Sequence, residues 1–330
     1  RVLLVDGKAV FMRPVVPREE LLKRLNLVAG VVERRHTMPV LANVMVQLEA
    51  GQLSLTGSDG EVELIGRVLL AEPGEEGAIT VPARKLVDIC KSLPERSEVE
   101  FRVEQQRVVM KSGRSRFTLS SLPASEFPSI EEAATGQMVS LGQGQLKSLL
   151  DQTSFAMAQQ DVRYYLNGIY VHTLDVAGHT MLRAVATDGH RLARVEIPAP
   201  AGAAGMPGII VPRKAVAELQ KLIEGTSIDV TIELSTTKAR FTVGEVVLTS
   251  KLIDGTFPDY GRVIPSGNDK RLIVERAQFI AAVDRVSTIS SERGRAVKLS
   301  LADGKMTLTV TNPDSGSATE EIEVDYDSTP

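Results

Sequence analysis

The feature that most constrains the fold of this chain is an internal repeat. Two amphipathic segments begin with similar residues, Val81-Pro82-Ala83-Arg84-Lys85 and Val211-Pro212-Arg213-Lys214. The two segments lie about 130 residues apart. Phe127-Pro128 and Phe257-Pro258 each follow an alternating strand pattern and keep the same spacing. Two Asp-Gly pairs, at positions 59 and 188, keep it to within one residue. The sequence therefore predicts a duplicated unit of about 130 residues, with one fold in both copies.

A third copy of the unit begins near Glu275. Helical spacing of apolar residues recurs at Arg18–Val32, Gln145–Ala158 and Glu275–Ile289, and strand patterns then follow in the third copy at Val297–Leu301, Met306–Thr311 and Glu320–Asp325. The second amphipathic segment of the unit, Val81–Leu93 in the first copy, does not recur before Pro330. We therefore expect the third copy to be incomplete, by roughly fifty to sixty residues.

The turns between predicted strands indicate the fold class. Runs in which apolar and polar residues alternate are separated by Gly or Asp-Gly, as in β-hairpins, so neighbouring strands should be antiparallel. The prediction is an α+β fold of repeated antiparallel-sheet units, each with two helices that cover one face of the sheet. The expected divisions are an extension or cloning remnant over 1–11, a first domain over 12–136, a second over 137–265, and a truncated third over 266–330.

Composition limits the class of protein. With 43% hydrophobic and 24% charged residues among 330, the chain is typical of a globular protein of two or three domains. Its one cysteine, Cys90, excludes a disulfide framework and fits a reducing cytosol, so we expect a cytoplasmic protein. No apolar run approaches a membrane span, and no membrane partner is expected.

No pattern in the sequence predicts catalysis. The four histidines share no metal-binding spacing, and neither a phosphate-binding Gly-rich loop nor a nucleophile elbow is present. Asp188-Gly189-His190-Arg191 contains an acid beside a base, but the pattern favours a hairpin turn over an acid–base pair. The expectation is a protein that is not an enzyme and has neither cofactor nor metal.

Basic residues recur where the predicted helices begin. Arg84-Lys85, Arg213-Lys214, Arg18 and Arg276 occupy these positions. A cation there opposes the helix dipole, at a cost of roughly 0.3–1 kcal/mol each, so the pattern suggests a negatively charged partner. Solvated side chains that recur only through duplication explain it equally well. The net charge of −4, from 38 basic and 42 acidic residues, shows no overall basic excess.

Two loops at matching positions of the first two copies add to this pattern. Arg34-Arg35-His36 follows the first helix, and Gln159–Tyr165 lies in the matching loop of the second copy. Two adjacent tyrosines beside an arginine suit contact with a sugar–phosphate backbone. Alternatively, one tyrosine packs inward and the other covers the surface.

Six segments of the chain carry specific motifs, among them VRYYLNG, ATDGHRLA and TSKL-DG-FPDY. These segments are Val81–Leu93, Ser112–Pro128, Asp161–Gly168, Ala186–Ala193, Val211–Lys214 and Ser250–Tyr260. Together they resemble the bacterial β sliding clamp family, the processivity subunits of DNA polymerase III. The resemblance implies the DNA-clamp fold, with helices lining a ring that a head-to-tail homodimer closes around duplex DNA. It also implies that no reaction is catalysed. Basic residues would then face the DNA and acidic residues would cover the outer surface, so the net negative charge of the chain is compatible with DNA binding.

The resemblance also implies two binding sites. Residues that match positions near DNA in relatives are Arg35, Arg84, Lys85, Gln160, Arg163, Tyr164, Tyr165, Arg213 and Lys214. A hydrophobic cleft would bind linear peptides of the DNA polymerase III alpha subunit, the clamp loader delta subunit, other polymerases and repair proteins. Its matching residues are Leu166, Thr187, Gly189, His190, Arg191, Leu192, Pro258, Arg262 and Val263. A Leu or Phe of the peptide would fill a small apolar pocket there.

Contact between subunits would join the first domain of one chain to the third of its partner. Phe117 and Leu119, flanked by Arg114 and Arg116, match one side. The other side is matched by Thr288, Ile289, Glu320 and Glu321. The chain departs from the family at Gly261, where a basic residue is common, and in its incomplete third copy. That incompleteness leaves ring closure and full peptide affinity open.

Two other functions remain compatible with the residues alone. A DNA-cleaving enzyme would use Asp188 and His190, and an adaptor that binds peptides would share the cleft without touching DNA.

Overall fold

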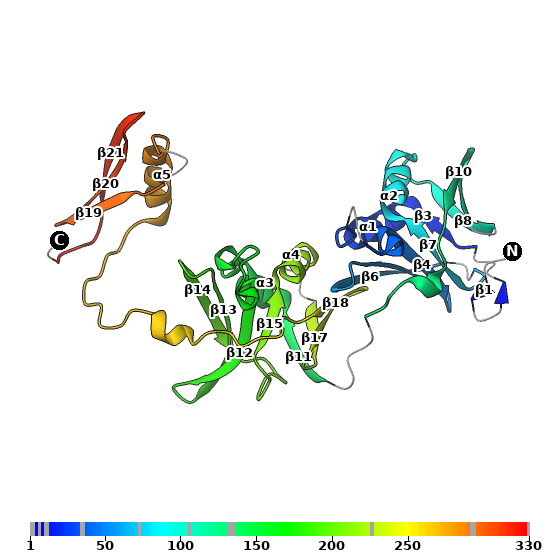
Figure 1. The fold of residues 1–330 in the computed structure, drawn as a ribbon, viewed down its shortest axis with the longest axis horizontal. Coiled ribbons are helices and arrows are strands. Elements are labelled where there is room, and N and C mark those ends of the chain that lie inside the picture. Colours follow the sequence, from blue (N-terminus) through cyan, green and yellow to red (C-terminus); the bar gives the residue numbers. More distant parts are fainter. Residues whose placement is uncertain are drawn as a thin grey trace. The chain divides into compact units, whose positions relative to one another are not determined.

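The computed structural model describes residues 4–5, 8–9, 13–33, 37–71, 74–104, 107–130, 136–224, 228–290 and 295–328. The chain divides into two compact units, Arg1–Phe257 and Pro258–Pro330 (Figure 1). The first contains the first two repeats, and the second contains the third. Ahead of them, β1 (Leu4–Val5) pairs with β2 (Lys8–Ala9).

Helices begin within two residues of the positions predicted from apolar spacing. The described helices are α1 (Arg18–Val28), α2 (Ala83–Ser92), α3 (Gln143–Asp151), α4 (Arg213–Leu222) and α5 (Arg276–Ser287). In α2 the buried face is formed by Ala83, Leu86 and Cys90. Burial of Cys90 raises the pKa of its thiol to about 12.

The predicted extent of the helix Gln145–Ala158 was wrong. The helix ends at Asp151, and a short 3-10 turn, Ser154–Ala156, follows. The hydroxyl of Thr153 donates a hydrogen bond of 2.6 Å to the carbonyl oxygen of Leu149. A threonine hydroxyl that bonds a carbonyl four residues earlier competes with the helical pattern, which explains the early end. The first helix likewise ends at Val28 rather than Val32.

The first repeat forms two antiparallel sheets. One has the order β10-β9-β8-β3 and the other contributes β6-β5-β4-β7. Their bounds are β3 Val15–Pro17, β4 Asn43–Glu49, β5 Gln52–Ser58, β6 Val62–Leu69, β7 Gly77–Pro82, β8 Glu98–Glu104, β9 Arg107–Ser112 and β10 Ser115–Ser120. Short hairpins connect several of these strands, and the turn residues Gly51 and Gly113 have positive φ, as the turn signals predicted.

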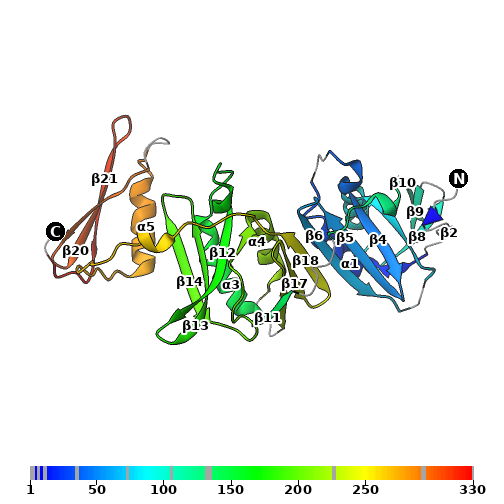
Figure 2. The same ribbon diagram turned by 60° about the horizontal axis from the view of Figure 1, so that its bottom comes forward.

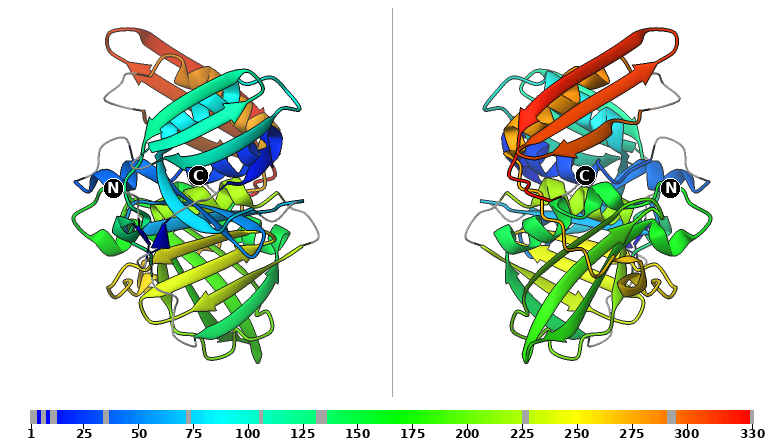
Figure 3. Two further views of the ribbon diagram at one scale, coloured as in Figure 1. Left: turned by 90° about the vertical axis from the view of Figure 1, so that its right-hand side faces the viewer. Right: turned by 90° about the vertical axis from the view of Figure 1, so that its left-hand side faces the viewer.

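The second repeat has the same two-sheet plan. One sheet has the order β14-β13-β12-β15 and the other contributes β11-β16-β17-β18. Their bounds are β11 Gln137–Gly142, β12 Gly168–Val176, β13 His179–Thr187, β14 Leu192–Pro198, β15 Ile209–Pro212, β16 Asp229–Leu234, β17 Lys238–Val243 and β18 Val246–Lys251. Because β18 pairs with β6, half of each repeat joins into one eight-stranded sheet (Figures 2 and 3).

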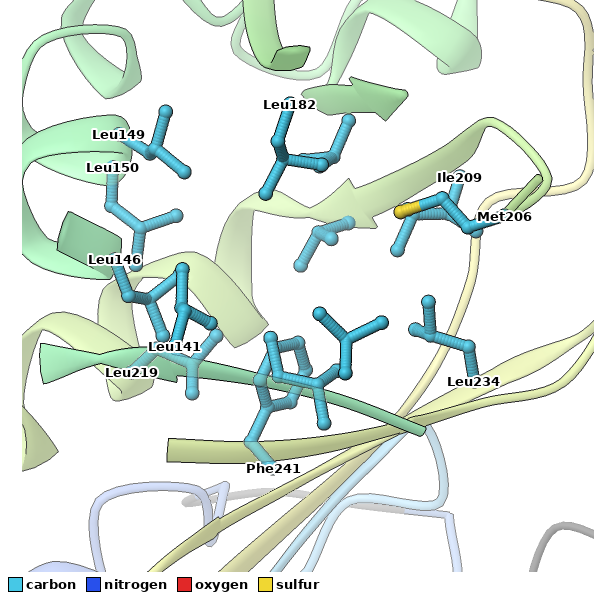
Figure 4. Close-up of a pocket in the computed structure, with 14 residues that line it drawn as sticks. Leu141, Leu146, Leu149, Leu150, Leu182, Met206, Ile209, Leu219, Leu234 and Phe241 are labelled. Carbon is cyan, nitrogen blue, oxygen red and sulfur yellow. The ribbon is translucent and has the colours of Figure 1, made fainter. Parts of the chain in front are cut away.

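A hydrophobic core runs through both repeats of the first unit. It packs α1 and α2 against the strands of the first repeat, and α3 and α4 against those of the second. The core of the second repeat contains an apolar cavity of about 40 Å³ between helix and sheet residues (Figure 4). Its walls include Leu146 and Leu150 of α3, Leu219 of α4 and Phe241 of β17. Only carbon and sulfur side-chain atoms line this cavity in the view of Figure 4.

The second unit repeats the first part of the same plan. Its sheet has the order β19-β20-β21, over Lys298–Ala302, Lys305–Asn312 and Gly316–Glu323. Helix α5 packs its buried Ala282 and Val286 against β20 and β21. The last strand therefore begins four residues earlier than the predicted Glu320–Asp325, since pairing with β20 extends back to Gly316.

Candidate functional site

The beginning of α2 presents two cations to solvent. Arg84 and Lys85 are exposed, and no ion pair or hydrogen bond involves either side chain within the described part of the chain. Both line an open surface groove between α2 and the segment that follows α1, together with Glu33 and Asp88. Arg84 and Lys85 are therefore available for an anionic partner.

The cation at the beginning of α4 is already paired. The Lys214 ammonium donates a hydrogen bond of 3.1 Å to Oε1 of Glu33 and a shorter one to Oδ2 of Asp59. Burial acts to raise the pKa of Asp59, but the bonds from Lys214 and from the amides of Val62 and Glu61 outweigh it and lower that pKa. Burial acts to lower the pKa of Lys214, and its two carboxylate partners raise it instead. Lys214 thus joins the second repeat to the first.

Two other cations at helix beginnings bind carbonyl groups of the protein. Arg18 donates to the carbonyl oxygens of Cys90, at 2.9 Å, and Lys91, at 3.3 Å, in the last turn of α2. Arg213 donates to the carbonyls of Met157 and Ala158. The guanidinium of Arg18 therefore satisfies carbonyls at the C-terminal end of α2, where a cation is also favoured by the helix dipole.

The segment Gln159–Tyr165, here called the tyrosine loop, holds its arginine on a carboxylate. Arg163 donates from Nε and Nη2 to the two oxygens of Asp161, at 3.0 and 2.8 Å. This bidentate pair lowers the pKa of Asp161 to about 2. Gln160 is exposed with a φ of +54°. Arg35, in the matching loop of the first repeat, lies outside the described residues.

The two tyrosines of this loop differ in exposure. Tyr164 is 57% exposed, Tyr165 is half-buried, and their rings meet edge to face with centroids 5.9 Å apart. The loop that contains Gly255 packs against both. Tyr164 therefore offers one face to solvent beside Arg163, and Tyr165 supports it.

The segment Thr187–Arg191, here called the cleft turn, connects β13 to β14. Asp188 Oδ1 accepts hydrogen bonds of 3.0 Å from the amides of His190 and Arg191, and Gly189 has a φ of +88°. The hairpin interpretation of this cluster is confirmed. The amide bonds are the largest cause of a lowered pKa of Asp188, and its second oxygen accepts from Arg191 Nε, so the carboxylate is engaged by its own turn.

The remaining residues of the predicted cleft fall into three environments. Leu166 is buried, at 2% exposure, and Leu192 is half-buried at the start of β14. Pro258, Arg262 and Val263 belong to the second unit and are exposed there, with Val263 at 67%. The first unit thus brings five of the nine residues, Thr187, Gly189, His190, Arg191 and Leu192, onto one hairpin.

The predicted subunit contacts lie at sheet edges. β10 is the outer strand of its sheet in the first unit, with Phe117 and Leu119 half-buried on its inner face. β21 is the outer strand in the second unit, and its Glu320 accepts from Nε and Nη2 of Arg285, at 2.9 and 2.5 Å. Thr288 caps α5, and Ile289 packs on the core of that unit.

No cluster of three or more His, Cys, Asp or Glu side chains suited to a metal ion occurs among the described residues. No helix in the described ranges is long and apolar enough to cross a membrane.

Sequence reasoning missed the residues that hold these loops in place. Asp161 anchors Arg163, and Asn167 in turn exchanges two hydrogen bonds of 3.0 Å with the backbone of Asp161. Phe155 lies under the guanidinium of Arg191, 5.6 Å from Cζ to the ring centre. Only the proximity of Asp161 to Arg163 in the sequence could have signalled one of these contacts.

Comparison with known proteins gives three consecutive family matches. The N-terminal, central and C-terminal domains of the DNA polymerase III beta subunit match residues 12–131, 140–259 and 261–330. The beta sliding clamp of Pseudomonas aeruginosa is 51% identical over 315 residues, which is 96% of this chain and 85% of that protein. The beta sliding clamp of Caulobacter vibrioides is 46% identical over 97% of this chain and 86% of its own length.

Solved structures give the same result. A sliding clamp of Bartonella birtlesii bound to griselimycin superposes with a TM-score of 0.94 at 50% identity, and covers 97% of this chain and 86% of its own. A sliding clamp of Pseudomonas aeruginosa bound to griselimycin has a TM-score of 0.91 at 49% identity, with 97% and 85% covered.

Proposed function

Because this chain belongs to the β sliding clamp family of DNA polymerase III, we propose that its exposed cations and its tyrosine loop face duplex DNA. The family consists of non-catalytic processivity subunits, so the chain serves replication by tethering a polymerase to DNA rather than by a reaction. The observation that carries the DNA site is the pair of exposed cations Arg84 and Lys85 in the first turn of α2, whose side chains have no partner within the described ranges.

The proposed DNA site contains nine residues with different tasks. Arg84, Lys85 and Arg163 attract phosphates, and Tyr164 offers a flat face to the backbone. Arg213 and Lys214 hold the second repeat in place through protein contacts. Arg35, Gln160 and Tyr165 complete the set. Phosphate contacts that do not read bases let a clamp slide.

The proposed peptide cleft centres on the cleft turn. An apolar anchor of a linear peptide would contact Leu166 and Leu192, while His190 and Arg191 would form the rim with Thr187 and Gly189. Pro258, Arg262 and Val263, which belong to the second unit, complete the proposed set of cleft residues. The proposed occupants are segments of the DNA polymerase III alpha subunit, the clamp loader delta subunit, other polymerases and repair proteins.

The junction between the first two repeats supports a register for the proposed subunit contact. β18 follows β17 through the pair Val243–Val246, and β10 follows β9 through the equivalent pair Ser112–Ser115. Phe117 and Leu248 lie at the same distance along the strand from these turns, so they are equivalent positions of the two repeats. Leu248 pairs with Leu64 of β6. The third repeat has an equivalent of Leu64 as well: when the pairs Gln52–Leu69 and Lys305–Glu323 are aligned, Leu64 corresponds to Ala318 of β21. The proposed ladder between two copies therefore pairs Phe117 with Ala318.

This register assigns a task to each predicted contact residue. Leu119 would lie opposite Gly316, with its side chain on the core side of the ladder like that of Phe117. Thr288 and Ile289 end α5 and would border the new ladder from the helix side. The unpaired backbone groups of two exposed edge strands would then be covered.

The proposed domain boundaries are 12–136, 137–265 and 266–330, with 1–11 as an extension. Three family matches starting at residues 12, 140 and 261 support this division. We propose a cytoplasmic location, which fits a chain with a single, buried cysteine.

The DNA site is tested by the salt dependence of binding. Arg84→Ala with Lys85→Ala should reduce the slope of log K against log salt by about two, because each lost phosphate contact removes roughly 0.9 from it. The double variant Lys270→Ala with Arg271→Ala removes two exposed cations outside the proposed site and is the control. Equal slopes for the parent and the Arg84–Lys85 variant would refute the site, provided that both melt alike.

A further inference from the structure

The side chain of Arg163 is fixed more firmly than a simple phosphate contact requires. Its amide donates to Asp161 Oδ1 at 2.8 Å, and its Nε and Nη2 donate to the two oxygens of the same carboxylate. Asn167, which directly precedes β12, bonds both the amide and the carbonyl of Asp161. The guanidinium is therefore oriented by a chain of hydrogen bonds that ends beside the sheet.

In that orientation the guanidinium lies against the cleft turn. Nη2 donates to the carbonyl oxygen of Asp188 at 3.5 Å. A Cβ atom placed on Gly189 would lie 3.1 Å from Nη2 and 3.2 Å from Nη1, so the turn and the guanidinium are in direct contact. The tyrosine loop and the cleft turn thus touch through one side chain.

The cleft turn itself is held by few other contacts. Asp188 and Thr187 bond within the turn, to the amides of Gly189, His190 and Arg191. Its outer contact is Arg191 over the ring of Phe155, which is itself exposed. Removal of Arg163 would therefore leave the tip of the turn without its neighbour from the tyrosine loop.

We propose that Arg163 is a positioning residue that links the DNA-facing loop to the cleft turn, so that duplex DNA and a cleft peptide bind cooperatively. This inference rests on the proposed function of both sites. Nη1 has no hydrogen-bond partner among the described residues, so it can donate to a phosphate while Nε and Nη2 stay on Asp161. A phosphate would then fix the guanidinium and the turn that it touches, and a peptide would meet a more ordered cleft. Linkage makes the effect reciprocal.

The first measurement is peptide affinity without DNA. The probe is a fluorescein-labelled synthetic decapeptide that ends in Leu-Phe, followed by fluorescence anisotropy with the full 330-residue chain. Arg163→Ala and Arg163→Lys should both weaken binding, by about threefold to tenfold, because lysine keeps the charge but lacks the planar fork. Lys298→Ala, which removes an exposed cation on β19 outside both proposed sites, should leave peptide affinity unchanged.

The second measurement repeats the titration with saturating duplex DNA. The parent chain should bind the peptide more tightly with DNA than without it, by at least about fivefold, and Arg163→Lys should lose this gain. Peptide affinities that are equal in the parent and both Arg163 variants, or that do not respond to bound DNA, would overturn the inference while leaving both sites intact. Failure of the parent to bind the decapeptide at all would instead overturn the proposed cleft, and the inference with it.

Discussion

Leu248 of β18 lies directly opposite Leu64 of β6, and both side chains are buried, so a single β-ladder joins the first repeat to the second. An edge strand of the second repeat is covered here by the neighbouring copy of the same fold. The equivalent strand of the first repeat, β10, remains an outer strand of its sheet. The junction inside the chain is therefore a physical template for a junction between two chains.

We expect a disulfide to trap this second junction. In the proposed register Thr118 lies opposite Ser317 of another copy, on the outer face of the ladder. Opposed residues of an antiparallel pair have Cα atoms about 4.5–5.5 Å apart, which suits a disulfide. Thr118→Cys with Ser317→Cys should form disulfide-linked products of twice the chain mass under mild oxidation, joined at one junction or closed at both.

A variant on the opposite face controls for chance collisions. Thr118→Cys with Ala318→Cys shifts one thiol by a single residue and turns it to the core side, so it should cross-link poorly. Preferential cross-linking of this control pair would show that the register is wrong.

Lys214→Met should weaken the junction between the first two repeats. The ammonium of Lys214 joins Glu33 and the largely buried carboxylate of Asp59, and such charged hydrogen bonds contribute about 1.5–3 kcal/mol. We expect the free energy of unfolding to fall by that amount at neutral pH, as measured by urea denaturation. Lys251→Met is the matched control: Lys251 pairs with Glu61 across the same junction at 2.9 Å, but both side chains are exposed, so the cost is about 0–1 kcal/mol.

The pH dependence of this difference has a definite sign. The pKa of Asp59 is lowered from its ordinary 3.8, so its contribution is present above pH 3.8 and is lost as the pH falls through the lowered value. The pKa of Lys214 is raised from 10.5, so its contribution is lost only as the pH rises above that value. The difference between parent and Lys214→Met should be flat between these limits. A difference that vanishes near pH 6 would contradict the assignment.

Val139→Ile should stabilise the second repeat. Val139 lines the apolar cavity of about 40 Å³, and one added methylene has space there. Burying it should contribute up to about 0.8 kcal/mol to the free energy of unfolding, seen as a higher melting temperature. Val46→Ile places the same group in the packed core of the first repeat and should be neutral or destabilising. Destabilisation by both changes would mean that the cavity does not accommodate the added methylene.

Gly189→Ala should weaken peptide binding, whereas Gly178→Ala should not. Both glycines have positive φ, of +88° and +82°, so both substitutions strain the backbone, by about 1 kcal/mol. Only at Gly189 would the new Cβ also meet a neighbour, the guanidinium of Arg163. Anisotropy titrations of the two variants with the decapeptide separate backbone strain from displacement of the cleft turn. Equal peptide affinity in both would count against the contact.

Local patterns in the sequence predicted the repeat, the helix starts and the hairpins well. Apolar spacing determines which face of α2 is buried, and Gly or Asp-Gly determines where strands turn, so both could be read without tertiary information. The end of α3 could not be read in this way. It depends on a hydrogen bond from Thr153 that helical periodicity does not reveal.

The partners of the basic residues were beyond the reach of sequence. Arg18 and Lys214 looked alike as cations at helix beginnings, yet Arg18 binds carbonyls of α2 and Lys214 binds carboxylates of the first repeat. Such partners are distant in sequence and are set by packing of the repeats. Arg84 and Lys85, in contrast, keep the exposure that the pattern suggested.

We expect the chain to stay on DNA by encircling it, and its release from cut DNA tests this most directly. The chain is loaded by a clamp loader onto a nicked circular duplex, separated by gel filtration in high salt, and the circle is then cut once. A ring should remain with the circle at high salt and leave promptly after the cut, since no base-specific contact holds it. Retention that is equally strong on circular and linear DNA, or dissociation from the uncut circle as salt rises, would contradict topological binding.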